Sequence, residues 1–313
     1  MVKLLRMRGR KAGSTASRDA LSNPGRTFTI LNYLLLGSLS LAFLLPFVMI
    51  VSTSLMTQAD VLKYGTFRLV PNDIDLSAYR MILSKGSMIY SGYLVTAIRV
   101  VVGTFLNLAF TTALAYGLSK KKLAGRNAFI SFIFITMVFS GGLIPTYMVV
   151  KALGLTNTIW ALMIPNLINA YNFILMKTFF TQMPDSLEES ACIDGANPLQ
   201  ILLRIVVPLS LPSLATIGLF YGVAHWNAWF DAAIFINDYN KMPLQIILRD
   251  AIIHLSGDKV GLSMTVIDTS IKKPPTIAFR SAIIVISTLP ILLVYPYIQK
   301  YFVKGVMIGS VKG

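Results

Sequence analysis

Residues 188–208 read EESACIDGANPLQILLRIVVP and decide the fold, because they form a polar corner between long apolar runs. Just before them, Ser186 and Glu189 have the spacing of a capping box, which predicts a short helix that begins at Ser186. Gly195 lies where glycine commonly follows the end of a helix. The next Asn-Pro pair predicts the start of a second short helix. Because this corner would leave backbone groups unpaired in lipid, we expect it to lie in water at a membrane face.

The rest of the chain has the composition of a membrane protein. Of its 313 residues, 55% are hydrophobic and 13% are charged. Six uncharged runs are each about 20 residues or longer, the length that a transmembrane helix requires. We therefore predict an all-α membrane protein with six transmembrane helices. The runs lie between Arg26 and Asp60, Arg99 and Lys120, Arg126 and Lys151, Lys151 and Lys177, Arg204 and Asp231, and Arg280 and Lys300.

The distribution of basic residues predicts the orientation of the spans. Residues 1–26 form a basic tail, and 27–313 form the six-span domain; by the positive-inside rule both termini are cytoplasmic. Loop 183–208 is then cytoplasmic, and loops 54–91 and 237–276 are extracytoplasmic. Anionic lipid is a sufficient partner for the net charge of +15, so we expect no nucleic-acid binding. The basic clusters are Lys3, Arg6, Arg8, Arg10, Lys11, Arg18 and Arg26, then Lys120, Lys121, Lys122 and Arg126, and finally Lys300, Lys304 and Lys312.

The polar corner resembles the cytoplasmic EAA loop of binding-protein-dependent ABC importers. That loop reads Glu-Ala-Ala, three residues, Gly, nine residues and then Ile-x-Leu-Pro. The triplet Asp194-Gly195-Ala196 is similar to the version found in sugar importers. The residues in register are Glu189, Ala191, Gly195, Ile205 and Pro208, and the departures are Ser190 and Val207.

Three further segments extend the resemblance to the maltose-permease-like family, with its type I importer permease architecture. They are GLIPTYMVVKALGLTNTIWALMIP at 142–165, HWNAWFDAAIFIND at 225–238 and YFVKGVMIGSVKG at 301–313. The insertion at 237–276 is similar to a subgroup of oligosaccharide permeases rather than to the maltose protein itself. The resemblance implies import of a sugar or oligosaccharide by alternating access, in the bacterial cytoplasmic (inner) membrane.

The resemblance also implies partners. The first short helix of the EAA loop would dock on a cytoplasmic ATPase, and closure of two such ATPases would switch the spans between inward- and outward-facing states. A second related permease and an extracytoplasmic solute-binding protein complete the expected assembly. Acidic residues would pair with basic residues of the ATPase, and Ala191 would leave room for close docking. The expected coupling residues are Asp185, Glu188, Glu189, Ala191, Asp194, Gly195 and Ala196.

The chain shows no chemistry of its own. It has no GxxxxGK[ST] phosphate loop, and Cys192, His225 and His254 do not form a metal set with ligand spacing. We therefore expect no catalytic residue, no metal and no bound cofactor, with ATP and Mg²⁺ held by the partner ATPases. The lone cysteine also excludes an internal disulfide.

Polar and aromatic residues in the fourth and fifth spans are candidates for a substrate pathway. If the fifth span were one helix, Asn227 and Asp231 would share a face, with Trp226 beside Trp229. Aromatic faces and amide or carboxylate groups suit a sugar, although an aromatic belt at the membrane interface is the alternative. The sequence does not determine which sugar is transported, its length or its charge, and the basic loop 237–276 leaves an acidic oligosaccharide open as one alternative. The candidate residues are Asn172, Trp226, Asn227, Trp229 and Asp231.

Other classes of protein remain as alternatives. The main one is a gradient-driven carrier or channel that works alone, against which few charged residues lie at membrane depth. A membrane-embedded enzyme or scaffold is disfavoured because no catalytic residues cluster. An importer of amino acids or peptides would share the EAA loop, but the Asp-Gly-Ala triplet and the tail favour carbohydrate.

The corner glycine yields a first test. Replacement Gly195→Asp is expected to leave the protein in the membrane but abolish transport, because a side chain strains the positive φ angle that the corner requires. Uptake into membrane vesicles measures the effect, and immunoblotting of the membrane fraction serves as the control. Uptake at the wild-type rate would contradict the role of the corner.

Overall fold

The computed structural model describes residues 26–66, 68–84, 87–254 and 276–310, so the basic tail before Arg26 and most of loop 237–276 lie outside it. The described part contains helices, loops and one isolated β-bridge between Met56 and Ile74, which confirms the all-α class. The first half holds α2 (Arg26–Ser54), α3 (Gln58–Tyr64), α4 (Ser77–Ile82), α5 (Met88–Ile98), η1 (Arg99–Gly103), α6 (Thr104–Ser119), α7 (Arg126–Val138) and α8 (Leu143–Ala152). The second half holds η2 (Ile159–Leu162), α9 (Ala170–Thr181), α10 (Asp185–Ile193), α11 (Pro198–Ile201), η3 (Leu202–Val206), α12 (Val207–Leu209), α13 (Leu211–Asn227), α14 (Phe230–Phe235), η4 (Tyr239–Lys241), α15 (Leu244–His254) and α16 (Thr276–Ser310).

Three helices are long and apolar enough to cross a membrane: α2, the continuous helix Met88–Ser119, and Ile277–Val294 within α16. Two bent pairs qualify if each pair counts as one span. One is α7 with α8, bent by 118°, and the other is Pro198–Leu209 with α13, bent by 84°. The described residues thus hold up to five spans by this test, and the count of six stays a prediction.

The run between Lys151 and Lys177, predicted as the fourth span, does not form one continuous helix. It contains the short 3₁₀ turn η2, and α9 starts only at Ala170. Pro165 lies in the irregular stretch between them, where it supplies no N–H for a helix. The Asn169 side chain then accepts the Asn172 backbone N–H at 3.1 Å, so it caps the new helix at its N-terminus.

Local sequence explains the other breaks. Gly142 has φ +88°, a conformation that glycine adopts without strain, and it separates α7 from α8. The second bend falls at Ser210, which lies between Pro208 and Pro212.

The helix Met88–Ser119 packs at the centre of the molecule, and its glycine, alanine and threonine residues let neighbouring helices approach closely. It contacts α9, α13 and α15. A Cβ atom on Gly103 would lie 2.7 Å from Nε2 of His225, and one on Gly92 would lie 2.6 Å from Cδ1 of Ile247. Larger residues at either position would therefore push the neighbouring helix away.

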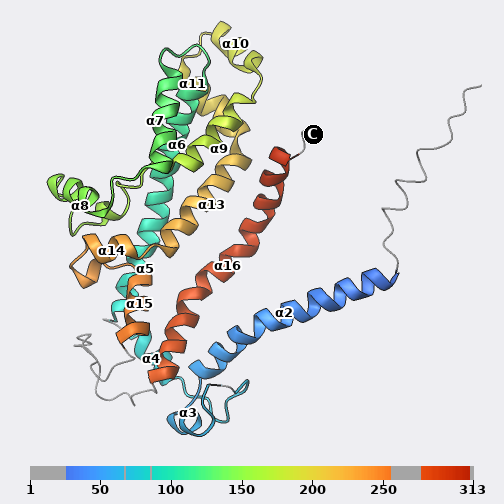
Figure 1. Ribbon diagram of the computed structural model, residues 1–313, viewed down its shortest axis with the longest axis vertical. Helices are drawn as coiled ribbons and strands as arrows, with labels where there is room; N and C mark the ends of the chain where they lie inside the picture. Colours follow the sequence, from blue (N-terminus) through green and yellow to red (C-terminus); the bar gives the residue numbers. More distant parts are fainter. Residues whose placement is uncertain (1–25, 67, 85–86, 255–275, 311–313) are drawn as a thin grey trace, which may run out of the picture.

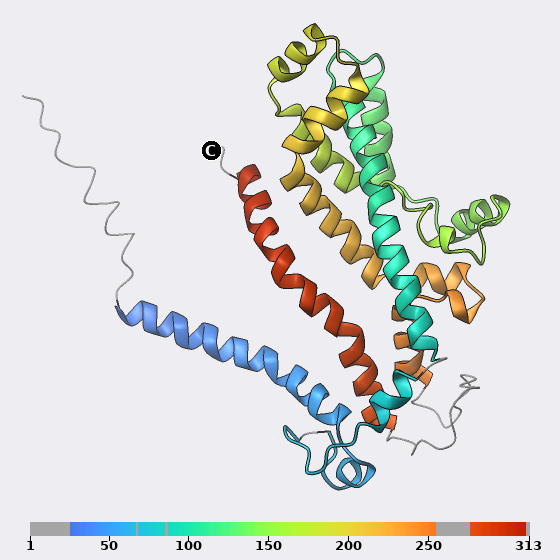
Figure 2. The same ribbon diagram turned by 180° about the vertical axis from the view of Figure 1, so that it is seen from behind.

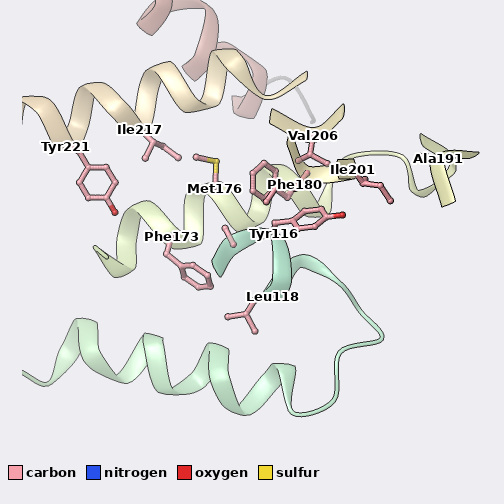
Figure 3. Packing of buried hydrophobic residues seen from close by; sticks show 12 residues of the cluster. Tyr116, Leu118, Phe173, Met176, Phe180, Ala191, Ile201, Val206, Ile217 and Tyr221 are labelled. Atoms are coloured by element: carbon pink, nitrogen blue, oxygen red, sulfur yellow. The ribbon is translucent and has the colours of Figure 1, made fainter. Parts of the chain in front are cut away.

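A buried hydrophobic cluster joins this helix to the polar corner (Figure 3). It includes residues of the bundle and also Ala191 of α10, so the corner is packed onto the spans. The buried members are Ala115, Tyr116, Leu118, Phe173, Met176, Phe180, Ala191, Ile201, Leu202, Val206, Ile217 and Tyr221.

The predicted loops lie at opposite ends of the molecule. Helices α10 and α11 are at one end, and α3 and α4 are at the other (Figures 1 and 2). Helix α4 lies within the predicted loop 54–91. The arrangement is compatible with loops on opposite sides of a membrane, and the sidedness itself stays a prediction.

Helix α2 leaves the bundle and contacts α16 near one of its ends (Figures 1 and 2). Its buried residues are confined to the last turn, at Ser52–Ser54. Apolar side chains along the rest of α2 are exposed, for example Leu41 and Phe43, each with 71% of its surface accessible. This helix therefore offers an apolar surface to lipid or to another chain.

Candidate functional site

A cavity of about 830 Å³ lies among η1, the irregular segment before α9, α13 and α14. Carboxamide and aromatic side chains dominate its wall, so it offers hydrogen-bonding groups beside flat apolar faces. Its volume falls within the range of roughly 300–1,000 Å³ that is usual for small-molecule sites. The polar and aromatic lining residues are Arg99, Asn107, Thr136, Asn166, Asn169, Tyr171, Asn172, Tyr221, His225, Asn227, Trp229, Phe230 and Asp231.

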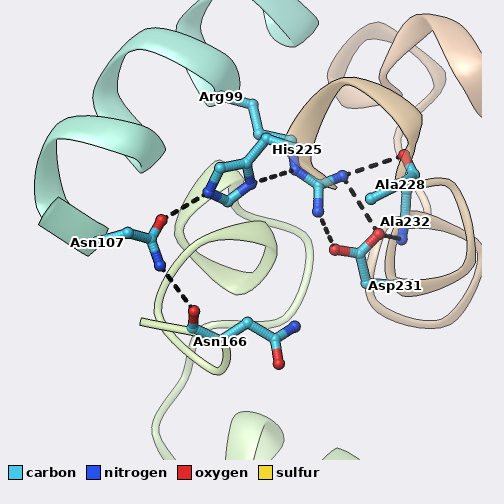
Figure 4. A network of polar contacts seen from close by, with 7 residues as sticks. All are labelled: Arg99, Asn107, Asn166, His225, Ala228, Asp231 and Ala232. Carbon is cyan, nitrogen blue, oxygen red and sulfur yellow. Dashed lines mark hydrogen bonds and ion pairs between the residues drawn. The ribbon is translucent and has the colours of Figure 1, made fainter. Parts of the chain in front are cut away.

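An ion pair forms one wall of the cavity (Figure 4). Arg99 donates through Nη1 to Oδ1 of Asp231 at 3.2 Å and through Nη2 to Oδ2. The same Nη1 donates to the backbone oxygen of Ala228 at 3.3 Å. The Arg99 side chain is 2% exposed and that of Asp231 is 15% exposed, so both charges depend on each other for stabilisation. Removing one partner of such a pair typically costs about 3–5 kcal/mol.

His225 links the ion pair to the central helix. Arg99 Nε donates to Nδ1 of His225 at 3.3 Å, so Nδ1 is unprotonated and the ring carries its proton on Nε2. Nε2 then donates to Oδ1 of Asn107 at 2.7 Å. This chain of contacts also fixes the orientation of the Asn107 amide, whose Nδ2 points away from the ring (Figure 4).

Two side chains pair the backbone of the broken fourth span. Asn107 Nδ2 donates to the backbone carbonyl oxygens of Asn166 and Leu167, at 2.8 and 2.7 Å. The Tyr221 hydroxyl accepts the backbone N–H of Asn169 at 3.0 Å and hydrogen-bonds to Oγ1 of Thr111 at 2.8 Å. Irregular backbone at membrane depth is tolerated where protein groups pair it and it lines a cavity, and both conditions hold here.

Four of the five predicted pathway residues line the cavity: Asn172, Asn227, Trp229 and Asp231. Trp226 lies elsewhere, in an apolar groove between η1, α6, α13 and α16, and it packs against the buried cluster that contains Leu244 and Phe279. The expectation that Asn227 and Asp231 share a helical face is wrong, because α13 ends at Asn227 and Asp231 belongs to α14. Ala228 is extended at this break, which turns the chain back toward the cavity.

The residues that organise the cavity are not among the predicted site residues. In the sequence Arg99 only bounds an apolar run, and Asn107 and Tyr221 lie within such runs. One signal was present: Arg99, Asn107 and Thr111 recur at multiples of four residues, which places them near one face of a helix. The contact of this face with His225 and Tyr221 could not be read from spacing.

The polar corner folds as two short helices, α10 and α11, and α10 begins one residue earlier than predicted. Helix α10 begins at Asp185 after an extended Pro184 and has no side-chain cap, so the predicted capping box of Ser186 and Glu189 is wrong. The proline ends the preceding helix and starts the next one earlier than the serine would. Gly195 has φ +80°, as predicted.

The second helix of the corner starts as expected. Asn197 is its N-cap and Pro198 its first residue. The Asn197 side chain accepts the Gln200 N–H, and the Gln200 side chain accepts the Asn197 N–H, each at 2.9 Å. The capping box of this region is therefore located at α11 rather than α10.

Some of the predicted coupling residues are exposed, and the others pack against or pair with residues of this same chain. Asp185, Glu189, Asp194 and Gly195 are exposed, whereas Ala196 is half-buried against the hydrophobic cluster. Ala191 is 8% exposed and packs within this chain, so the expected room for a partner at Ala191 is absent.

Glu188 is bound within the chain as well. It pairs with Lys120, which follows the last residue of α6. Lys120 Nζ also lies 4.1 Å from the centroid of the Tyr116 ring, a favourable cation–π contact. The Glu188 carboxylate therefore holds α10 to the end of the central helix.

Two apolar residues in this region were not predicted as part of the site. Ile193 is 86% exposed and Leu199 is 63% exposed. They lie on α10 and α11, beside the exposed acidic residues. Apolar side chains rimmed by charges are typical of a protein interaction surface.

Comparisons with known proteins agree with this geometry. Residues 123–308 match the family of binding-protein-dependent transport system inner membrane components. Over 288 residues the chain is 44% identical to the polygalacturonan/rhamnogalacturonan transport system permease protein YtcP of Bacillus subtilis, covering 92% of this chain and 99% of that protein. It is also 44% identical to protein LplC of the same organism, over 92% of this chain and 96% of LplC.

A solved structure of an ABC transporter also resembles this chain. A chain of a bacterial ABC transporter involved in the import of the acidic polysaccharide alginate superposes with a TM-score of 0.80 at 36% identity. The match covers 90% of this chain and 99% of that one. The resemblance therefore extends over nearly the whole fold.

The chain belongs to the family of binding-protein-dependent transport system inner membrane components. It is a permease subunit of the ABC importer class, a multi-pass protein of the bacterial inner membrane that works with other components and is not itself an enzyme. The alternative of a carrier or channel that works alone is contradicted by this membership.

The contact between Lys120 and Glu188 is expected to position α10 for transport. Reversal of either charge (Lys120→Glu or Glu188→Lys) should lower uptake severalfold, whereas the double reversal should restore it. Stability should change little, because partly exposed ion pairs contribute about 0–1 kcal/mol. Uptake and ATP hydrolysis by the reconstituted transporter measure the effect.

Lys121→Glu provides a matched control, because it reverses the charge of an exposed neighbouring residue. It should retain most of the uptake. If the double reversal is as inactive as the single ones, the pair does not act as a positioning contact.

Proposed function

We propose that this chain forms part of the translocation pathway of an ATP-driven importer of acidic oligosaccharides, which works by alternating access. The observation that carries the proposal is the cavity, whose amide and aromatic groups suit the hydroxyls and C–H faces of sugar rings. YtcP is named for polygalacturonan and rhamnogalacturonan, and the structural relative for alginate, all of them acidic polysaccharides.

Positive charge beside the cavity supports an acidic substrate. The Arg249 guanidinium lies 4.4 Å from the centroid of the Trp229 ring, and Trp229 lines the cavity. Lys241 lies in the same outer region and donates to the backbone oxygen of Asn157 at 3.0 Å. Both basic residues already have an aspartate partner, Lys241 with Asp238 at 3.6 Å and Arg249 with Asp250 at 3.5 Å, and such partly exposed pairs are weak enough to exchange for a substrate carboxylate. The sequence also places Lys259, Lys272 and Lys273 in this loop, outside the described residues.

Energy for transport would come from ATPase partners that dock on α10 and α11. Exposed Ile193 and Leu199 would enter an apolar cleft, and the carboxylates of Asp185, Glu189 and Asp194 would pair with basic residues around it. Two such subunits would hold ATP and Mg²⁺, and this chain would bind no cofactor. Closure of the ATPases would move α10, and the cluster around Ala191 would transmit that motion to the spans.

The remaining partners would be a second related permease and an extracytoplasmic solute-binding protein. The exposed apolar length of α2 supports the second permease, because it extends beyond the bundle of its own chain (Figure 1). The end of the molecule that carries α3 and α4 would face the binding protein. Both termini would then be cytoplasmic, as the positive-inside rule predicts.

Site-specific cross-linking tests the ATPase contact. In a Cys192→Ser background, Ile193→Cys is expected to cross-link to an ATP-binding subunit in native membranes, because this side chain is 86% exposed on α10. Leu62→Cys is the matched control: it is 77% exposed on α3, at the opposite end. Equal cross-linking from both positions, or none from Ile193→Cys, would contradict docking at α10.

Uptake of defined sugars tests the substrate class. Proteoliposomes that contain the assembled transporter and its binding protein should import an oligogalacturonide when ATP is hydrolysed. Uptake of the carboxyl-reduced, neutral form should be at least about tenfold slower, since charge-assisted hydrogen bonds to the carboxylates are lost. Import of the neutral form alone would contradict an acidic substrate.

A further inference from the structure

Two of the residues that line the cavity carry a full charge, and they are paired with each other. Arg99 presents both terminal nitrogens to the two oxygens of Asp231. The remaining polar wall consists of amides, hydroxyls and the His225 ring. Arg99 is therefore the cationic partner available in the cavity to a sugar carboxylate, and it is already paired with Asp231.

Arg99 and Asp231 are held by different parts of the fold. Arg99 belongs to the central helix, in the π-helical turn η1, and its Nε is bound to His225 independently of the carboxylate. Asp231 lies on the six-residue helix α14, beyond the break at Ala228. The guanidinium can therefore stay in position when α14 moves. π-helical turns of this kind are frequent at functional sites.

We propose that Arg99 binds the carboxylate of the transported sugar through Nη1 and Nη2. In the absence of sugar, Asp231 binds these two nitrogens, and the sugar carboxylate displaces it. This inference rests on the acidic oligosaccharide function proposed above. A uronate carboxylate and an aspartate side chain offer the same planar pair of oxygens, and guanidinium binds both in a bidentate manner. During the exchange, Asp231 keeps one internal hydrogen bond, from the Ala232 N–H to Oδ1 at 2.9 Å.

The exchange explains why an importer of anions would keep a carboxylate in its own pathway. An unpaired arginine in a protected cavity would hold a uronide strongly and delay its release. The exchange keeps the guanidinium paired, and the cost of releasing Asp231 from Arg99 offsets part of the free energy gained by binding the sugar carboxylate. A pathway must bind its cargo strongly enough to admit it and weakly enough to let it leave.

A purely structural role would give a different result. If the pair only closes the chain break after α13, its loss should affect acidic and neutral sugars alike. If Arg99 reads the carboxylate, its loss should affect acidic sugars selectively. The ratio of affinities for an oligogalacturonide and its carboxyl-reduced form therefore distinguishes the two roles.

The experiment measures direct binding of both sugars to the detergent-solubilised transporter complex, without the solute-binding protein, by calorimetry. Asp231→Asn should tighten binding of the acidic sugar about tenfold, because a charge-assisted pair forms without displacing a carboxylate. The neutral sugar should change less than about twofold, since its hydroxyls make no such pair. Asp73→Asn is the matched control, because it removes a carboxylate that does not line the cavity, and should leave both affinities unchanged.

Arg99→Gln should lower the preference for the acidic sugar about tenfold or more, and Arg99→Lys should retain part of it because the charge remains without the bidentate geometry. If Arg99→Gln fails to assemble, Asp231→Asn decides the question by itself. Equal changes for both sugars in these variants would overturn the inference. Wild-type binding of the neutral sugar alone would instead overturn the proposed acidic substrate.

Discussion

The structure depends on one constraint: backbone groups within a membrane must be paired by protein groups. The fourth predicted span does not meet this requirement with its own helix, because it is irregular until Ala170. Asn107 pairs two of its carbonyl groups, and Tyr221 pairs the N–H of Asn169. These contacts leave an unwound segment beside a cavity instead of a continuous apolar helix.

The same contacts connect the different walls of the cavity to one another. Asn107 reaches the fourth segment with its nitrogen and His225 with its oxygen, and His225 reaches the Arg99–Asp231 pair (Figure 4). Three stretches that are distant in sequence, residues 99–107, 166–167 and 225–231, thus share one hydrogen-bonded network. A movement of α13 or α14 must change the wall of the cavity, because it must break or stretch these contacts.

The central helix Met88–Ser119 also joins the cavity to the polar corner. Arg99 and Asn107 lie along it, and Lys120 follows its last turn and pairs with Glu188 of α10. The cluster that contains Tyr116 and Ala191 packs around the same end (Figure 3). Displacement of α10 by a partner would therefore act on a helix that carries the cavity's main polar groups.

The sequence by itself determined the features that depend on local chemistry: apolar helices, the turn at Gly195, the cap at Asn197 and the family resemblance of the corner. It failed where a break changed the direction of a helix, as between Asn227 and Asp231, or where Pro184 moved the start of α10 to Asp185. Only the tertiary structure decided that Trp226 faces an apolar groove, that Glu188 is bound by Lys120, and that Arg99 meets Asp231 in the cavity. The physical reason is that caps and turns arise from neighbouring residues, whereas these partners are brought together by the packing of separate helices.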